Sequence, residues 1–154
     1  MKLKTNIKVS APASIANLAC GFEVLGVAIH QPKDEIIITE ANEPGIHITE
    51  IIGNKQKRIP LETEKNTAGL AAQTLLTHLI QEHGVDKEIG LNFKLIKKVP
   101  IGFGIGSSSA SAAAGVMAVN EVLGKPLTKR ELVKFAAFGE KQAERAFRIN
   151  SVAP

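Results

Sequence analysis

The sequence predicts a single α+β domain, and three observations favour that class. Strand-like alternation of apolar residues gathers in the first third of the 154 residues, whereas helical spacing dominates later. A glycine-rich segment then joins the last predicted strand to the helices that follow it. Early strands followed by helices favour α+β over regular β-α alternation. The length and the 44% hydrophobic content suit one globular domain with a real core.

The early strands are predicted from period-two patterning. Residues 3–9 alternate polar and apolar side chains, and we expect Pro12 to end that strand. Residues 34–41, "DEIIITEA", form a strong strand pattern. A turn signal at 42–45 precedes "IHITEI" at 46–51. This order predicts a hairpin between the two segments.

The later elements have recognisable ends. Asn66 or Thr67 can cap a helix that Gly84 terminates. The segment "GLNFKLIKKV" that follows alternates as a strand until a proline stops it. Residues 128–131, "TKRE", have the capping-box pattern and start a helix through about Arg145.

Composition narrows the function classes. The chain lacks Trp and Tyr, which argues against base stacking on single-stranded nucleic acid. Its net charge of +4 includes the clusters "KQKR" (55–58) and "KLIKK" (94–98). We interpret both as solvated edges or turns, with attraction of an anionic ligand as the alternative. Cys20 is the sole cysteine, so no internal disulfide can form, which fits a reducing compartment. The sequence has neither an apolar run long enough to span a membrane nor the apolar core of a signal peptide. We therefore expect a cytoplasmic protein.

The segment "VPIGFGIGSSSA" (99–110) predicts an anion site. Gly102, Gly104 and Gly106 alternate before a helix that opens near Ser107. Glycine permits positive φ and close approach, and the first amides of a helix have no intrahelical acceptor. The helix dipole adds partial positive charge, so phosphate is the natural occupant, with serine hydroxyls available to Mg²⁺. A plain strand-to-helix turn needs only one Gly and one Ser, and the patterns of a Walker A loop and a dinucleotide fingerprint do not match.

A resemblance becomes specific at these residues. "PIGFGIGSSSA" (100–110) resembles the phosphate loop of the GHMP kinase superfamily. Residues 9–29 and 64–72 resemble segments of its homoserine kinase family. Gly-Glu at 139–140 and Val-Ala-Pro at 152–154 fall where that family has the same residues.

The resemblance implies a ribosomal S5 domain 2-like fold with a left-handed β-α-β unit. Residues 1–154 would be the GHMP kinase N-terminal ATP-binding domain, with the C-terminal GHMP domain absent. We expect the chain to stop inside a larger protein, because its last residues read as a connection. The implied activity is ATP-dependent phosphorylation of the side-chain hydroxyl of L-homoserine, a step toward threonine.

The resemblance also implies roles for individual residues. Glu140 and Ser108 would be catalytic, and Ser107 and Glu140 would hold Mg²⁺. Asn17, Glu23 and Asn150 would contact L-homoserine. The triphosphate of ATP would be wrapped by Pro100, Ile101, Gly102, Phe103, Gly104, Ile105, Gly106, Ser107, Ser108, Ser109 and Ala110, with Asn66 near the base.

Two departures and several alternatives accompany these expectations. Glu23 stands where the family has Asp, and residues 148–151 read R-I-N-S in place of H-A-D-N. A non-catalytic nucleotide-binding module is therefore one alternative, and another small-molecule GHMP kinase is a second. RNA binding by fold analogy is the third and weakest. We expect a small-molecule substrate, no nucleic-acid or membrane partner, and a chain that could form a homodimer.

Overall fold

The computed structural model describes residues 6–22, 24–53 and 59–152, with side chains through Gln142. Its strands are β1 (Ile7–Ala16), β2 (Gly26–Glu40), β3 (Gly45–Ile52) and β4 (Gly90–Ile96). The helices are α1 (Thr67–His83), α2 (Ser107–Val122) and α3 (Lys129–Val152), with a 3₁₀ turn, η1, at Thr63–Lys65. The predicted α+β class is confirmed.

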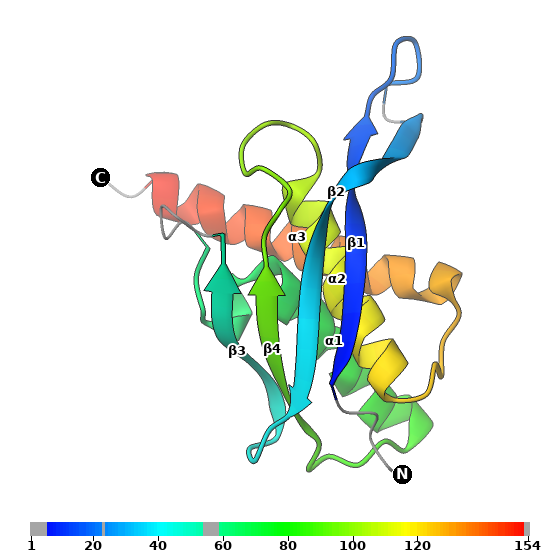
Figure 1. The fold of residues 1–154 in the computed structure, drawn as a ribbon, viewed down its shortest axis with the longest axis vertical. Coiled ribbons are helices and arrows are strands. Elements are labelled where there is room, and N and C mark those ends of the chain that lie inside the picture. The colour runs from blue at the N-terminus through cyan, green and yellow to red at the C-terminus, as the bar shows by residue number, and fades with distance from the viewer. Residues whose placement is uncertain (1–5, 23, 54–58, 153–154) are drawn as a thin grey trace.

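The strands form one mixed sheet in the order β1-β2-β4-β3. β2 is antiparallel to both of its neighbours, and β3 runs parallel to β4. In Figure 1 the chain leaves β3 upward, passes behind the sheet through α1 and returns as β4 on the right. The β3-α1-β4 crossover is therefore left-handed, unlike the right-handed connections that dominate parallel strands.

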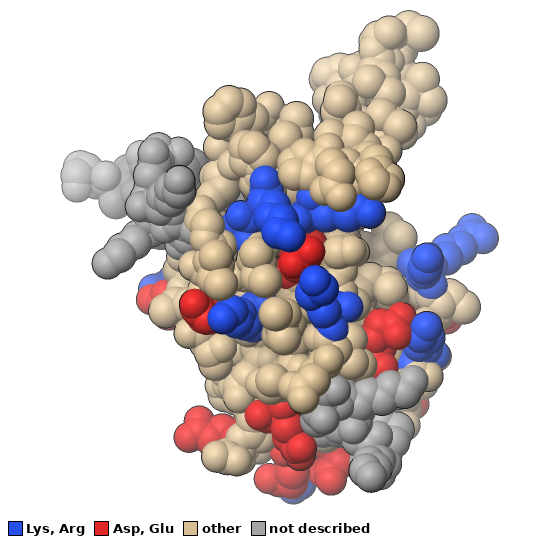
Figure 2. All heavy atoms as spheres, in the orientation of Figure 1, with Lys and Arg blue, Asp and Glu red and all other residues tan. Residues whose placement is uncertain are grey.

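The three helices cover one face of the sheet and leave the other open (Figure 1). The open face carries lysines interspersed with acidic side chains (Figure 2), including Lys94 paired with Glu50, and Lys8 and Lys98 paired with Glu35. The covered face supplies the core, in which Phe93 and Ile38 are fully buried among leucines of α1 and small residues of α2. Burial of this aliphatic interior supplies the main driving force for folding.

Two strand predictions are wrong. Residues 46–51 do not form a hairpin with β2, because β4 lies between the two strands. Pro12 does not end β1, which continues to Ala16. β1 is an edge strand in the described sheet, and its register with β2 shifts between Pro12 and Ser14, so a proline is tolerated there. Residues 3–5 of the predicted strand and the cluster 55–58 lie outside the described residues.

The predicted ends of the helices are largely confirmed. Asn66 caps α1 with its side chain, and Gly84 ends that helix in the left-handed conformation, with φ of 65°. The capping box at residues 128–131 is present. α3 extends seven residues beyond the predicted end at Arg145, to Val152. None of the helices in the described part of the chain is long and apolar enough to cross a bilayer.

Candidate active site

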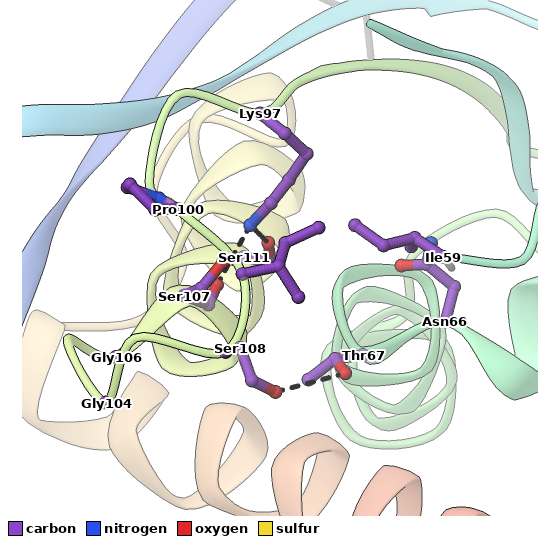
Figure 3. Close-up of a pocket in the computed structure, with 12 residues that line it drawn as sticks. Ile59, Asn66, Thr67, Lys97, Pro100, Gly104, Gly106, Ser107, Ser108 and Ser111 are labelled. Atoms are coloured by element: carbon purple, nitrogen blue, oxygen red, sulfur yellow. Dashed lines mark hydrogen bonds between the residues drawn. The ribbon is translucent and has the colours of Figure 1, made fainter. Parts of the chain in front are cut away.

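A cavity of about 330 Å³ opens beside the glycine-rich loop. It lies where the end of β4 meets the N-termini of α1 and α2 (Figure 3). The residues that line it are Ile59, Asn66, Thr67, Lys97, Pro100, Ile101, Gly102, Gly104, Gly106, Ser107, Ser108 and Ser111. Chain segments far apart in sequence therefore converge on one hollow.

The loop backbone depends on glycine. Gly102, Gly104 and Gly106 have φ of 84°, 70° and 68°, a backbone region that residues other than glycine rarely adopt. A Cβ at Gly102 or Gly104 would meet nothing within 4 Å, so this part of the loop faces open space. At Gly106 a Cβ would collide with the Ser14 side chain of β1.

Gly106 is the N-cap of α2 and provides no side-chain cap for the helix. The amides of the first helical turn have no intrahelical acceptor, and the helix dipole places partial positive charge there. The Ile105 carbonyl accepts a hydrogen bond from the Ser14 amide at 3.1 Å, which ties the loop to β1. The geometry thus offers an anion backbone donors in a glycine-lined opening.

The three serines at the start of α2 point in different directions. The Ser107 hydroxyl donates to the Val99 carbonyl at 3.0 Å. The Ser108 hydroxyl donates to the Thr67 hydroxyl at 3.3 Å, across the gap between α2 and α1 (Figure 3). The Ser109 hydroxyl donates to Glu140 Oε1 of α3 at 2.6 Å. Each serine therefore links α2 to a different neighbour.

Asn66 organises the second helix N-terminus at the cavity. Its side chain is buried, and its Oδ1 accepts from the amides of Ala68 and Gly69 at 3.0 and 3.2 Å. Its Nδ2 donates to the Pro60 carbonyl at 2.9 Å. The amide group of Asn66 is thus engaged in holding α1 and the preceding loop.

Lys97, which lines the cavity, belongs to a buried ion pair that the sequence interpretation missed. Lys97 pairs with Asp34, and the two side chains are each only 3% exposed. Lys97 Nζ also donates to the Ser107 carbonyl at 3.0 Å and to Ser111 Oγ at 2.7 Å. Burial lowers the pKa of Lys97, and the Asp34 carboxylate opposes that shift. The interpretation of "KLIKK" as a solvated edge is therefore wrong for Lys97.

A signal for that burial was present in the strand alternation. Leu91, Phe93 and Leu95 face the core, and Lys97 is the next residue in the same register. Asp34 likewise precedes the buried Ile36 and Ile38 of β2. The strand pairing Ile36↔Leu95 places Asp34 and Lys97 opposite each other beyond the last paired residues.

The predicted site residues divide into two groups. Asn66, Pro100, Ile101, Gly102, Gly104, Gly106, Ser107 and Ser108 line the cavity. The remaining members of 100–110 do not: Phe103 is 77% exposed, Ile105 packs against the core, Ser109 bonds to Glu140 and Ala110 is buried.

Of the other predicted residues that the structure describes with side chains, Asn17 and Glu140 do not line the cavity. Asn17 is exposed in the connection between β1 and β2, with φ of 57°. Glu23 is outside the described residues, and Asn150 lies on α3 without a described side chain. Glu140 accepts a hydrogen bond from Ser109, at the start of α2. Among the described residues no three His, Cys, Asp or Glu side chains gather as a metal cluster.

The mixed sheet with its left-handed crossover, together with a glycine loop at a helix N-terminus, defines an α+β domain with a candidate anion site. Residues 66–147 match the GHMP kinases N terminal domain, and the chain belongs to this family. It is 40% identical over 147 residues to the homoserine kinase of Chlorobium phaeovibrioides, covering 94% of this chain and 46% of that protein.

Solved structures agree with this assignment. The crystal structure of homoserine kinase from Cytophaga hutchinsonii superposes with a TM-score of 0.81 at 41% identity, over 93% of this chain and 43% of that one. The mevalonate kinase of Methanococcus jannaschii, at 20% identity and a TM-score of 0.65, shares the fold over 90% of this chain and 47% of that one. The chain therefore spans about half the length of the relatives it matches.

Proposed function

We propose that this chain binds Mg·ATP beside the glycine loop, as the N-terminal part of a kinase that phosphorylates the side-chain hydroxyl of L-homoserine. One observation carries the proposal: a glycine-lined opening at the N-terminus of α2, in a chain 40% identical to a protein named homoserine kinase. A role in threonine biosynthesis, a cytoplasmic location and a homodimer are parts of the same proposal.

The residues present fit a polyphosphate. Space is open around Gly102 and Gly104, and the N-termini of α1 and α2 both border the cavity. These helix termini favour negative charge. In the proposal, residues 100–110 wrap the triphosphate and Asn66 forms the wall near the base. Phosphoryl transfer needs positioning and charge neutralisation more than covalent help from the protein, so such a loop suits this chemistry.

The proposed metal and substrate residues are oxygen-bearing side chains around this loop. Ser107 and Glu140 would hold Mg²⁺, which prefers oxygen ligands, and Ser108 and Glu140 would act on the transferred group. When bound, ATP would supply the phosphoryl group and Mg²⁺ would neutralise part of its charge. L-homoserine would be held by Asn17, Glu23 and Asn150. The proximity of Glu140 to Ser109, at the start of α2, supports the metal assignment.

Placing a negative charge in the loop tests nucleotide binding directly. Gly102→Asp points a carboxylate into open space, and Asp is among the residues that best tolerate positive φ. Repulsion of the triphosphate should weaken Mg·ATP binding by about tenfold or more, measured by isothermal titration calorimetry. Gly124→Asp is the matched control, because Gly124 has φ of 81° and open space around it but does not line the cavity.

The two glycine variants should therefore differ in affinity and agree in stability. Equal affinities, or a folded wild-type chain that binds no Mg·ATP at millimolar concentration, would refute the nucleotide site. ADP release in the presence of L-homoserine distinguishes the kinase from the second candidate, a nucleotide-binding module without turnover. The coverage of 46% of the relative's length favours testing that module explicitly.

A further inference from the structure

We propose that Asp34, Lys97 and Ser111 form a buried clamp that fixes both ends of the glycine loop in the shape that receives an anion. They are positioning residues rather than ligand contacts. The inference rests on the proposed nucleotide site and assigns a role to three side chains outside the phosphate-loop segment 100–110.

One carboxylate organises the start of the loop and the start of the following helix. Asp34 Oδ1 accepts the amides of Lys98 and Val99, at 2.9 and 2.8 Å, immediately before Pro100. Asp34 Oδ2 accepts from the Lys97 ammonium and from Ser111 Oγ, the latter at 3.1 Å. Asp34 thereby connects β2, the end of β4 and the second turn of α2.

The donor inventory of Lys97 distinguishes positioning from direct binding. An ammonium group has three N–H donors. Lys97 has three acceptors in the structure: Asp34, the Ser107 carbonyl and Ser111 Oγ. All three donors are used by the protein, although the side chain lines the cavity. A nucleotide would therefore meet a loop held by Lys97, not a free lysine donor.

The middle of the loop explains why its ends need such anchoring. A Cβ at Gly102 or Gly104 would have no neighbour within 4 Å, so nothing packs against the loop on the side where a side chain would lie. The loop is closed between its ends by the hydrogen bond from Ser107 Oγ to the Val99 carbonyl. Glycine-rich backbone is conformationally permissive, and a preorganised loop loses less entropy when it binds its ligand.

Affinity measurements on matched variants test the clamp. Lys97→Met removes the ammonium, and Ser111→Ala removes one hydroxyl from the network. The control is Asn120→Ala on the same helix, because the buried Asn120 side chain bonds the Leu127 carbonyl and amide at 2.9 and 3.1 Å, away from the cavity. Titration calorimetry gives the Mg·ATP dissociation constant, and urea unfolding gives the stability of each full-chain variant.

We expect Lys97→Met to weaken Mg·ATP binding by about tenfold or more and Ser111→Ala by a smaller factor, as when supporting residues of a binding site are lost. Asn120→Ala should lose stability but keep its affinity within about twofold. Unchanged affinity in a folded Ser111→Ala, even if Lys97→Met binds weakly, would overturn the clamp, because Lys97 would then act as a direct contact. If Lys97→Met fails to fold, Ser111→Ala decides the question alone.

Amide hydrogen exchange without nucleotide separates this proposal from the proposed function. Ser111→Ala should accelerate exchange of residues 99–110 relative to the centre of β4, whereas Asn120→Ala should not. If the wild-type chain binds no Mg·ATP, the nucleotide site fails and the exchange result judges the clamp. Equal exchange of 99–110 in Ser111→Ala and the wild type would then overturn it.

Discussion

At the scale of single residues, residue type predicted the glycines of the loop, whereas only strand register indicated the buried lysine beside the cavity. The need for glycine at positive φ is a local property, visible in the spacing of 102, 104 and 106. Burial of Lys97 depends on a partner 63 residues away, Asp34. Lysine is almost never fully buried unless paired, so residue type pointed to solvent while strand register pointed inward.

Asn66 caps α1 with its side chain, and its replacement should lower the stability of the fold. Asn66→Ala leaves the amides of Ala68 and Gly69 without their acceptor and the Pro60 carbonyl without its donor. We expect a loss of about 1–2 kcal/mol in the free energy of unfolding, measured by urea denaturation. Asn66→Asp keeps the acceptor but not the donor, so it should lose less. An equal loss of stability in both variants would show that the Oδ1 acceptor of Asn66 contributes nothing as a cap.

At the scale of elements, the turn after β2 could be predicted but the partner of β3 could not. A turn signal fixes where the chain reverses, whereas the partner strand depends on a crossover that comes later in the chain. The structure inserts β4 beside β2, and the Gly90 carbonyl accepts from the Ala41 amide at 2.9 Å. A side chain at Gly90 would collide with the Glu43 carbonyl, so glycine lets this turn lie against the start of β4.

The capping box of α3 gives an element-scale prediction about pH. Glu131 Oε2 accepts from the Thr128 amide and hydroxyl at 2.8 and 2.7 Å, and these bonds lower the pKa of Glu131 below its ordinary value. A carboxylate with a lowered folded-state pKa stabilises the fold above its unfolded pKa, and this stabilisation is lost as pH falls through the folded value.

Glu131→Gln should therefore be less stable than the wild type at neutral pH, and the difference should shrink as pH falls below 4.5, the ordinary pKa of a glutamate. Chemical unfolding at several pH values measures it. Glu88→Gln, another exposed position, controls for the loss of one surface carboxylate. A difference between Glu131→Gln and the wild type that stays constant with pH would contradict the assigned role of the carboxylate.

At the scale of the whole molecule, the α+β class followed from local periodicities, whereas the assembly of the site did not. Helical and strand patterns are set by neighbours within a few residues. Strand order, the left-handed crossover and the meeting of Asp34, Lys97 and Ser111 depend on contacts between distant segments. The resemblance of residues 100–110 to a phosphate loop pointed to the segment beside which the cavity lies, but not to the network that holds it.

The packing of the helix layer also depends on glycines that the sequence interpretation left unexplained. Gly115 of α2 approaches the Ala68 backbone, and Gly139 of α3 approaches Ala71 of α1. Both glycines lie inside helices, where glycine is normally destabilising relative to alanine. Because these glycines have no side chain, α1 can pack closely against both α2 and α3.

Substitution of Gly139 by alanine sets two effects against each other. Helix propensity favours Gly139→Ala by about 1 kcal/mol. The added Cβ would lie 2.6 to 2.9 Å from Cβ, Cα and N of Ala71, and overpacking of this kind costs about 1–3 kcal/mol. Because two of these three atoms are backbone atoms and cannot rotate away, we expect the clash to dominate and the free energy of unfolding to fall.

The matched control for this substitution is Ala137→Gly, at an exposed position on the same helix. It should also destabilise, by about 1 kcal/mol, through propensity alone. Opposite exchanges that both lower stability in urea unfolding cannot both arise from propensity, so the pair isolates the packing effect. Gly139→Ala should in addition displace the neighbouring Glu140, whose Oε1 accepts from the Ser109 hydroxyl at 2.6 Å. A more stable Gly139→Ala protein would show that the helix layer can separate without cost.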